Sequence, residues 1–408
     1  MKLDRVALFA SIAIFAACAD GVGTPVSPDV RTATPFPARA SEFMSNYVAI
    51  GTSVSMGWMD DGVFFGSQNR SWTSQLAEQA EVEFTVPGIQ APGCQPPLAT
   101  PLASFRRVNG QSAGSSAVCA ANLAGTTLPA HNLAIENATT SEALNATPAT
   151  ASQGRGPVTS RVLPPGMTQM TAMASLKPTF VSVEFGGNEI LPAQVGLLYP
   201  GVTFTPFPVF QANYSRIIDH VKSTGAKAVL VSIRTDLRKF PTIRTGPEIA
   251  SQRAAFAAYN VAVSANCDAS ENYVFVRGKV LTAVITGITR AGYGLGPFEL
   301  SCADVPGTLD YILTPADINY LNGLAEQTSD EIEARAAENG YAVFPLGVLY
   351  NKVKEDVPFE LGAFLTSGSP YGKRISLDGV HPSADGHSVL ARAARVAISK
   401  AYGTGRPD

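Results

Sequence analysis

One stretch near residue 50, Tyr47-Val48-Ala49-Ile50-Gly51-Thr52-Ser53-Val54-Ser55, predicts the first strand of the fold. Its first four residues can fill a buried parallel strand, and a glycine and two small hydroxyl residues follow them. A β/α protein presents a serine in this way at the carboxyl end of its first strand. Ser53 is therefore the candidate nucleophile. Because Gly-x-Ser alone also fits an ordinary loop serine, this assignment depends on two later segments.

Apolar runs and segments of helical spacing alternate along the rest of the chain. The clearest strand is Phe180-Val181-Ser182-Val183-Glu184-Phe185, which ends in Gly186-Gly187-Asn188-Glu189. We predict further strands over residues 83–86, 132–135, 228–233, 273–276 and 341–344, and helices over residues 167–176, 209–223, 249–265, 314–339 and 383–402. This alternation predicts a parallel sheet covered by helices on both faces.

Composition limits the class of protein. The chain has 408 residues, of which 45% are hydrophobic and 15% charged, so it can bury a large core. A net charge of −3 without a cluster of Lys and Arg indicates neither binding to nucleic acid nor a helix that lies on a membrane surface. Segments rich in small residues and Pro, near residues 87–131 and 267–310, predict two loop-rich insertions in one domain over residues 43–408.

Residues 1–18 have the pattern of a bacterial export signal. Lys2 and Arg5 precede an apolar run that is too short to span a bilayer as a mature helix. The run ends in Phe15-Ala16-Ala17-Cys18, which resembles a lipobox with Phe in place of the usual Leu. We expect a lipid on Cys18 and a flexible tether over residues 19–42, which would hold the domain on a bacterial membrane, in the periplasm or outside the cell. The alternative is an ordinary secretory signal in which Cys18 is incidental.

Four further cysteines, Cys94, Cys119, Cys267 and Cys302, remain in the exported part of the chain. An even number in an oxidising compartment predicts two disulfides. Of the three possible pairings, we favour Cys94 with Cys119 and Cys267 with Cys302, because each pair brackets a Gly/Pro-rich segment without an evident apolar pattern. No Cys-x-x-Cys or His-Glu-x-x-His motif is present and the histidines are scattered, so we expect neither a metal site nor a cofactor.

The segment Asp378-Gly379-Val380-His381-Pro382 places a carboxylate and an imidazole three residues apart, just before the last predicted helix. At this spacing Asp378 can fix the tautomer of His381 and stabilise its protonated form. The other ring nitrogen can then take a proton from a serine hydroxyl. An Asp-x-x-His pair often occurs by chance, but a core histidine would rarely lie in such a Gly/Pro loop.

Three segments together resemble the SGNH/GDSL hydrolase family, because Gly51–Ser55, Gly186–Glu189 and Asp378–Pro382 match its first, third and fifth sequence blocks. The resemblance implies a flavodoxin-like three-layer α/β/α sandwich with a central parallel sheet. It also implies that Ser53 is the nucleophile, His381 the general base and then acid, and Asp378 its orienting partner. Asn188 and the main-chain N–H of Ser53 would bind the oxyanion. Members of this family are mostly esterases, lipases, thioesterases and carbohydrate deacetylases without cofactors.

Three positions depart from the family pattern. The second block normally supplies a glycine whose main-chain N–H completes the oxyanion hole, and the best match, residues 132–139, has Asn137 there. Asn readily accepts positive φ, so we expect Asn137 to keep this role. Thr52 replaces the family's Asp, and Glu189 replaces the Asp that often follows Asn188. These two departures affect the expected substrate more than the expected activity.

The resemblance therefore predicts a serine esterase or lipase that acts on a small-molecule or lipid acyl ester through an acyl-enzyme. The alternatives are a carbohydrate O-acetyl esterase of the same fold and a surface lipoprotein that binds without turnover. Ser112, in Gly110-Gln111-Ser112-Ala113-Gly114, fits the nucleophile elbow of a different fold but lacks its flanking strand and helix, so we regard the match as chance. His387 has no carboxylate three residues before it, and we expect a structural role for this residue.

Overall fold

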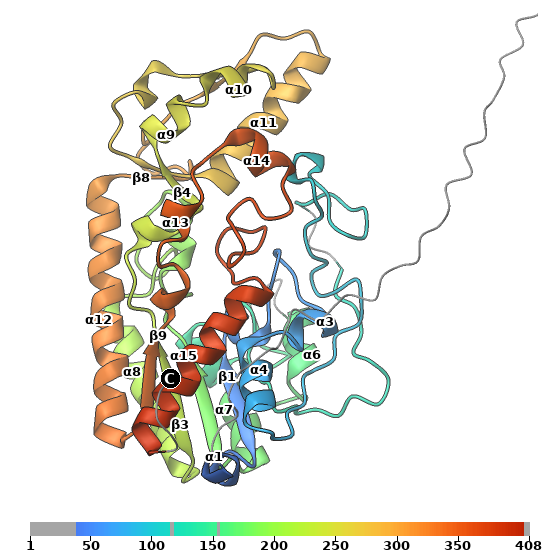
Figure 1. The fold of residues 1–408 in the computed structure, drawn as a ribbon, viewed down its shortest axis with the longest axis vertical. Coiled ribbons are helices and arrows are strands. Elements are labelled where there is room, and N and C mark those ends of the chain that lie inside the picture. The colour runs from blue at the N-terminus through green and yellow to red at the C-terminus, as the bar shows by residue number, and fades with distance from the viewer. Residues whose placement is uncertain (1–37, 115–117, 153–155, 404–408) are drawn as a thin grey trace, which may run out of the picture. The chain divides into compact units, whose positions relative to one another are not determined.

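The central sheet contains four parallel strands, which follow the order β1-β2-β3-β9 (Figure 1). They are β1 (Tyr47–Gly51), β2 (Phe180–Glu184), β3 (Lys227–Ser232) and β9 (Ala342–Pro345). The computed structural model describes residues 38–114, 118–152 and 156–403. Every residue of β1 and β2 is buried, which explains why their sequences are almost continuously apolar.

Residues 132–135 extend this sheet beyond β1. The N–H of Leu133 donates to the carbonyl of Ala49 at 2.8 Å, and the N–H of Ile135 donates to that of Gly51 at 3.1 Å. Ala49 and Asn132 form an isolated parallel bridge. The predicted strand at 132–135 thus lies beside β1 without a continuous ladder, and it brings the following turn to the carboxyl end of β1.

Helices cover both faces of the sheet, in agreement with the expected three-layer α/β/α sandwich. The covering helices are α4 (Trp72–Gln79), α7 (Gln169–Leu176), α8 (Phe207–Ser223), α12 (Pro315–Asn339) and α15 (Ala384–Tyr402). Ala49 and Val229 point into an apolar layer with α4 and α15. Their neighbours Val48 and Leu230 point into a second layer with α7, α8 and the second half of α12. Because successive side chains of a strand point to opposite faces, the residues of these strands are divided between two separate cores.

The longest helix, α12, begins and ends at residues that favour those positions. The Thr314 side chain accepts from the N–H of Asp317, whose carboxylate accepts in return from the N–H of Thr314 at 2.9 Å. Pro315 occupies the first turn, and Gly340 ends the helix in the left-handed region with φ 64°. The helix predicted over residues 314–339 is thereby confirmed.

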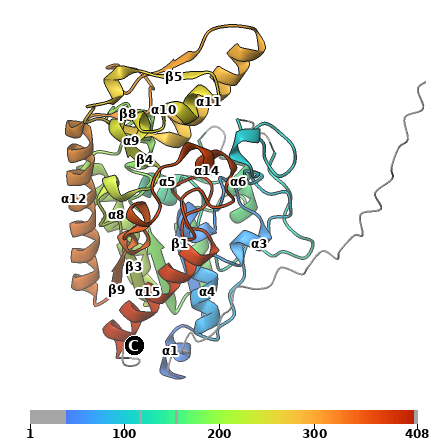
Figure 2. The same ribbon diagram turned by 45° about the horizontal axis from the view of Figure 1, so that its top comes forward.

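The second insertion is larger and more regular than the segment predicted near 267–310. Residues 243–313, the cap, form an antiparallel sheet of order β4-β6-β8, a parallel pair β5-β7 and three helices. Its elements are β4 (Ile243–Thr245), α9 (Gly246–Ala250), α10 (Arg253–Ala257), β5 (Val261–Val263), β6 (Tyr273–Phe275), α11 (Val276–Gly292), β7 (Phe298–Leu300) and β8 (Ile312–Leu313). Figures 1 and 2 show these elements beyond the carboxyl ends of the central strands.

Two details of the cap explain why it was misjudged. The single helix predicted over 249–265 is wrong, because Asn260 adopts φ 55° and Val261 and Val263 pair with β7. The insertion does have an apolar pattern, because α11 buries Val280, Val284 and Gly287 at helical spacing. The Cys267–Cys302 disulfide forms as predicted and closes residues 267–302 of the cap.

The first insertion, over residues 87–131, is loop-rich. Its only regular element among the described residues is a short 3₁₀ helix, Leu102–Ser104, and the predicted Cys94–Cys119 disulfide is formed. The strand predicted at 83–86 is wrong. The N–H of Thr85 donates to Nδ1 of His131 at 3.0 Å in place of a neighbouring carbonyl, which interrupts any ladder.

The remaining short helices connect these parts of the chain. They are α1 (Ala38–Phe43), α2 (Ser53–Met56), α3 (Phe65–Gln68), α5 (Thr140–Asn145), α6 (Gly156–Val162), α13 (Val353–Asp356) and α14 (Leu361–Thr366). The predicted signal, Cys18 and the tether as far as residue 37 lie outside the described residues, and residues 38–42 belong to α1. No helix in the described part of the chain is both long and apolar enough to cross a bilayer.

Candidate active site

Ser53 is the first residue of α2 and follows β1 after a single residue. Its side chain lies at the carboxyl end of the sheet, where open α/β folds commonly bind ligands. Gly51 makes the turn possible, because a Cβ at this position would lie 2.8 Å from the carbonyl oxygen of Glu184 on the neighbouring strand. The glycine of the predicted motif is thus explained by the close approach of two backbones.

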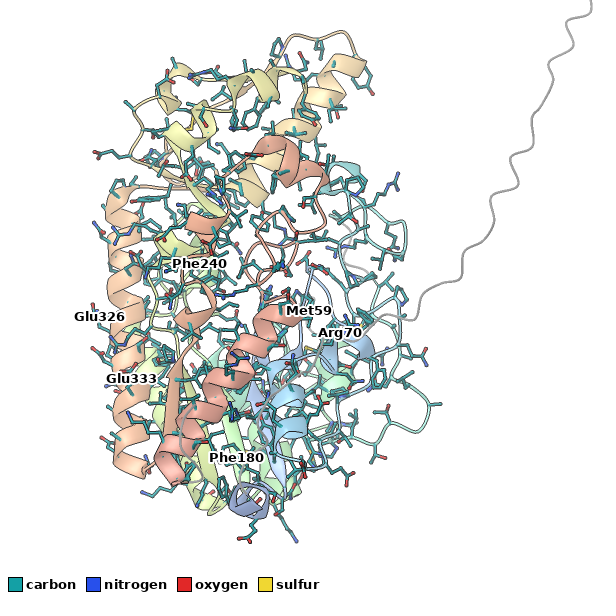
Figure 3. The ribbon with its side chains drawn as sticks, viewed as in Figure 1. Met59, Arg70, Phe180, Phe240, Glu326 and Glu333 are labelled. Atoms are coloured by element: carbon teal, nitrogen blue, oxygen red, sulfur yellow. A yellow bond between two sulfur atoms is a disulfide. The ribbon has the colours of Figure 1, made fainter. Side chains whose placement is uncertain are left out.

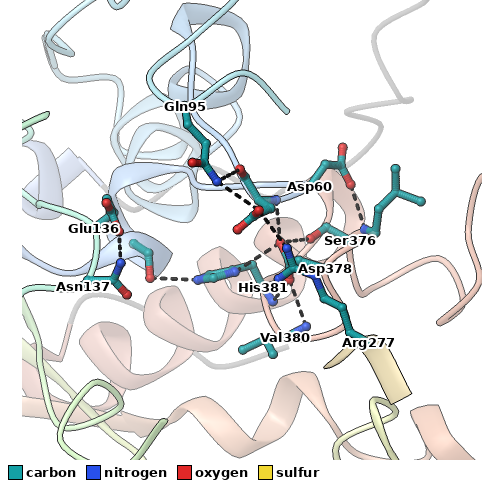
Figure 4. Close-up of polar contacts among 12 residues, drawn as sticks. Asp60, Gln95, Glu136, Asn137, Arg277, Ser376, Asp378, Val380 and His381 are labelled. Atoms are coloured by element: carbon teal, nitrogen blue, oxygen red, sulfur yellow. Dashed lines mark hydrogen bonds and ion pairs between the residues drawn. The ribbon is translucent and has the colours of Figure 1, made fainter. Parts of the chain in front are cut away.

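His381 reaches Ser53 from the other end of the chain. Its Nε2 lies 2.9 Å from Oγ of Ser53. Its Nδ1 lies 3.2 Å from Oδ2 of Asp378, without the alignment of a full hydrogen bond (Figure 4). At these distances an imidazole can accept the proton of a serine hydroxyl while its other nitrogen faces a carboxylate. The fold therefore brings together the three residues that were predicted to form a triad.

Asp378 is buried and surrounded by donors. Its Oδ1 accepts from the N–H of Val380 at 2.9 Å and of His381 at 2.8 Å, and its Oδ2 accepts from the hydroxyl of Ser376 at 2.8 Å. Burial opposes ionisation, but the neighbouring His381 and then Arg277 outweigh it, and they hold the pKa of Asp378 well below its usual range. Burial also opposes the charge on His381, but Asp378 outweighs that effect and raises the pKa of His381 above its usual 6.5.

Asp61 connects Asp378 to both insertions. Its N–H donates to Oδ2 of Asp378 at 2.9 Å. Its own Oδ2 lies 2.8 Å from Nη2 of Arg107, in the first insertion, and 2.7 Å from Nη2 of Arg277, in the cap. Gln95, also in the first insertion, donates to the same oxygen at 2.9 Å (Figure 4). One carboxylate thus holds two insertions beside the loop that carries Asp378.

Asp60, the residue before Asp61, also binds the loop that carries Asp378. Its Oδ1 accepts from the N–H of Leu377 at 2.7 Å. Burial raises the pKa of Asp60 to about 6; the hydrogen bond from Leu377 opposes this rise, and the charge of Asp378 adds to it. Both Asp60 and Asp61 have positive φ, at 54° and 59°, so their turn has a conformation that Asp accepts more readily than most residues.

Glu184, the last residue of β2, holds the turn around Ser53. Its Oε2 accepts from the N–H of Thr52 at 3.1 Å and of Ser55 at 3.2 Å, and its Oε1 accepts from the Thr52 hydroxyl at 2.8 Å. Burial raises the pKa of Glu184 to about 7, against the effect of these hydrogen bonds. Thr52, which replaces the family's Asp, is therefore paired with a carboxyl group that the neighbouring strand supplies.

Asn188 lies beside Ser53 at the end of the next strand. Its side-chain amide donates one hydrogen bond to the carbonyl of Ala138 at 3.0 Å, which fixes its orientation and leaves a second N–H. Oε1 of Glu189 accepts from the N–H of Thr140 at 2.6 Å. The Asn188-Glu189 pair thus binds the turn that contains Asn137. Asn137 adopts φ 54°, the positive value that the substitution for Gly was expected to require.

A cavity opens beside Ser53, Asn188 and His381. Its volume is about 90 Å³. Phe240, labelled in Figure 3, and Tyr350 both line it, and their rings stack with centroids 3.9 Å apart. Apart from the polar groups around Ser53, the walls are almost entirely apolar.

The residues that were set aside in the sequence lie where a structural role predicts. Ser112 is exposed and forms an isolated bridge with Arg106. His387 is fully buried, and its Nδ1 accepts from the N–H of Trp72 at 3.1 Å. Burial, and then the charge of His381, lower the pKa of His387 to about 3. Within the described ranges no group of three or more His, Cys, Asp or Glu side chains could hold a metal ion.

Four residues of the site were missed in the sequence: Asp60, Asp61, Glu184 and Arg277. Asp60-Asp61-Gly62 resembles an ordinary polar turn, and Arg277 lies more than 200 residues from either Asp. Only Glu184 carried a local signal, because a carboxylate inside an otherwise apolar strand needs a partner when it is buried.

A comparison with known proteins identifies the family of the chain. Residues 47–394 match the model of the GDSL-like lipase/acylhydrolase family. No curated protein matches the chain. Among solved structures, an extracellular lipase from Streptomyces rimosus has 15% identity, a TM-score of 0.34, and coverage of 85% of this chain and 98% of its own. A psychrotrophic esterase from a Pseudoalteromonas species has 11% identity, a TM-score of 0.35, and coverage of 87% and 97%.

An acetyl-xylooligosaccharide esterase from Geobacillus, in the form of a mutant, has 11% identity and a TM-score of 0.35, and covers 85% of this chain and 90% of its own. Identities and TM-scores this low support no inference about substrate. The family match, in contrast, spans most of the chain and includes all three segments on which the resemblance depends. The chain is therefore an ester hydrolase and belongs to the GDSL-like lipase/acylhydrolase family.

Proposed function

We propose that this protein hydrolyses carboxylic esters through a Ser53–His381–Asp378 triad and an acyl-enzyme intermediate. The observation that carries the proposal is the 2.9 Å contact between Nε2 of His381 and Oγ of Ser53, with Nδ1 facing a buried carboxylate. Asp378 is held ionised by its surroundings, so it can orient His381 and stabilise the imidazolium that forms during the reaction.

In the first half of the reaction, Oγ of Ser53 attacks the ester carbonyl while Nε2 of His381 takes the hydroxyl proton. The tetrahedral intermediate collapses when its C–O bond to the alcohol breaks, and the alcohol leaves with the proton from Nε2. A water molecule then attacks the acyl-enzyme, again through His381, and releases the carboxylic acid and free Ser53.

The oxyanion would be stabilised by three donors. They are the second N–H of the Asn188 amide and the main-chain N–H groups of Ser53 and residue 137. The neighbouring N–H groups of Thr52 and Ser55 donate to Glu184, so they are not available to an oxyanion. The hydrogen bond from Asn188 to Ala138 supports this arrangement, because it places the turn of Asn137 beside Asn188.

The two alternatives have less support. A carbohydrate O-acetyl esterase would place sugar hydroxyl groups near its nucleophile, and most of the cavity beside Ser53 offers them no hydrogen-bond partner. A protein that only binds its ligand would not need Ser53, His381 and Asp378 at catalytic distances.

The test is hydrolysis of p-nitrophenyl acetate by the purified exported protein. Ser53→Ala and His381→Ala should each lower kcat by about 10³-fold or more, because a nucleophile and its base act as a unit. Ser112→Ala should keep the wild-type rate. Normal turnover in Ser53→Ala, with loss of turnover in Ser112→Ala, would overturn the proposal.

Export and lipidation remain part of this proposal. Two disulfides are typical of proteins outside the cytoplasm, which supports export. Mass spectrometry of the N-terminal peptide from cell membranes should find diacylglycerol on Cys18. An unmodified N-terminus after a different cleavage site would leave a secreted enzyme without an anchor.

A further inference from the structure

The cavity beside Ser53 is formed jointly by the central domain and the cap. Ile190 and Leu346 line it from the central domain. Ile243, Phe275 and Leu313 line it from the cap, one from each strand of the β4-β6-β8 sheet. The first half of α12 supplies the wall between them, through Leu321 and Ala325. The cap thus closes the cavity, and it does so with apolar side chains.

Polar groups gather mainly at one end of this cavity. Ser53, Asn188 and His381 lie there with Thr52 and Glu184. The other lining residues with polar side-chain atoms are Gln194, Thr235 and Tyr350, and the Tyr350 hydroxyl donates to the carbonyl of Val380. A ligand that places its ester at the polar end must therefore extend an apolar group along the rest of the cavity. An acetyl group would leave most of this space unfilled.

The volume limits the length of that apolar group. A water-sized sphere occupies about 10–15 Å³, so a cavity of 90 Å³ accommodates roughly six to nine water-sized groups. A methylene group has roughly the volume of a water. The cavity therefore fits a linear chain of about six to nine carbons.

We propose that this cavity is the acyl site of a medium-chain esterase and that the cap sets the greatest chain length. The proposal rests on the ester hydrolysis proposed above and names its substrate class: esters of linear saturated acids with about six to nine carbons. Each methylene buried in the cavity should raise kcat/KM by about fourfold until the cavity is full.

The test measures kcat/KM of the exported protein for p-nitrophenyl esters with acyl chains from two to sixteen carbons. We expect a maximum at about six to nine carbons and a fall beyond it. Ala325→Leu adds bulk inside the cavity and should move the maximum to shorter chains. Ala337→Leu makes the same change on an exposed position of α12 and should leave the profile as it is.

A second variant keeps the test decisive if Ala325→Leu does not fold. Phe275→Ala enlarges the cavity from the cap side and should move the maximum to longer chains. A profile that falls steadily from acetate, or that neither variant shifts, overturns the acyl-site proposal even though ester hydrolysis stands. Absence of Ser53-dependent hydrolysis for every ester would instead overturn the proposed function.

A further arm separates the acyl chain from the alcohol. Hexyl acetate carries the long chain on the alcohol, and ethyl hexanoate carries it on the acid. Ala325→Leu should slow the hydrolysis of ethyl hexanoate much more than that of hexyl acetate. The reverse result would assign the cavity to the alcohol and overturn the proposal.

Discussion

The main-chain N–H of Asp61 donates a 2.9 Å hydrogen bond to Oδ2 of Asp378, while the Asp61 side chain forms ion pairs with Arg107 and Arg277. Asp378, which we propose orients His381, is thus bound to a turn that both insertions hold. This arrangement links the electrostatics of the proposed triad to two insertions that lie outside the central α/β/α sandwich. It also provides a way to change the site without replacing any residue of the triad.

The first prediction concerns pH. Because Asp378 and Asp61 both raise the pKa of His381, kcat/KM should rise with pH through an apparent pKa above 6.5, where the base becomes neutral. Asp61→Asn removes one negative charge near His381 and should lower the apparent pKa at which kcat/KM rises with pH. The pH profiles of kcat/KM for Asp61→Asn and wild type measure this shift. Asp330→Asn, which breaks the exposed ion pair with Arg234, is the control and should leave the apparent pKa of kcat/KM unchanged. A shift to higher pH in Asp61→Asn would contradict the account.

The second prediction concerns Glu184, whose folded pKa of about 7 lies above its usual 4.5. Below pH 4.5 the group is protonated in both the folded and unfolded states. As pH rises toward 7, the unfolded state ionises first, and the contribution of Glu184 to stability is lost. Glu184→Gln cannot ionise, so its free energy of unfolding relative to wild type should rise by about 2–4 kcal/mol between pH 4.5 and 8.

Urea unfolding of both proteins across this pH range checks the Glu184 prediction. The same substitution at exposed Glu78, on α4, is the matched control. A difference between Glu184→Gln and wild type that stays constant with pH would show that folding does not raise the pKa of Glu184, and would contradict the prediction.

The third prediction separates the main chain of residue 137 from its side chain. Asn137→Gly keeps the N–H and accepts φ 54°, so it should retain activity. Asn137→Pro removes the N–H and cannot adopt this φ, and it should cost about 3 kcal/mol in the barrier, as for a lost oxyanion donor. Measured kcat values, with folding checked by circular dichroism, distinguish the two. Equal damage from both variants would assign the role to the side-chain amide, and a fully active Pro variant would remove residue 137 from the site.

The fourth prediction tests the cap through its disulfide. Cys267–Cys302 closes 35 residues, so replacing both cysteines with Ser should lower the free energy of unfolding by about 3–4 kcal/mol. A looser cap should also weaken the preference for medium acyl chains, because Phe275 and Leu313 line the cavity. Thermal unfolding and the acyl-chain profile measure the two effects. Replacement of Cys94 and Cys119, in the first insertion, should affect stability but not the profile.

The parts of the site that could be predicted are those whose chemistry is local in sequence. Ser53 follows a strand, Asn188 follows another, and Asp378 precedes His381 by three residues, so each motif could be recognised without knowledge of its partners. The contacts of Asp61 with Arg107 and Arg277 could not be predicted, because they join residues from separate insertions. Likewise, the link between Thr52 and Glu184 depends on the parallel register of β1 and β2.

The elements of the fold that could be predicted are likewise those with a local signal in the sequence. Helices α12 and α15 were predicted closely, because each has a capping residue before a long amphipathic run. In the cap the strand predicted over residues 273–276 is confirmed as β6. Strands β4 and β8 were missed because they have only three and two residues, too short for an alternating pattern to be distinguished. Its longest helix, α11, follows β6 without a break, so the apolar residues of the two elements merge in the sequence.

The central claim, that Ser53 is the nucleophile, is tested most directly by covalent labelling. An alkyl fluorophosphonate transfers its phosphonyl group to an activated serine with loss of fluoride, and peptide mass spectrometry identifies the labelled residue. The account predicts one adduct, on the peptide that contains Ser53, formed in parallel with loss of activity and absent in His381→Ala. An adduct on Ser112, or complete inactivation without modification of Ser53, would contradict it.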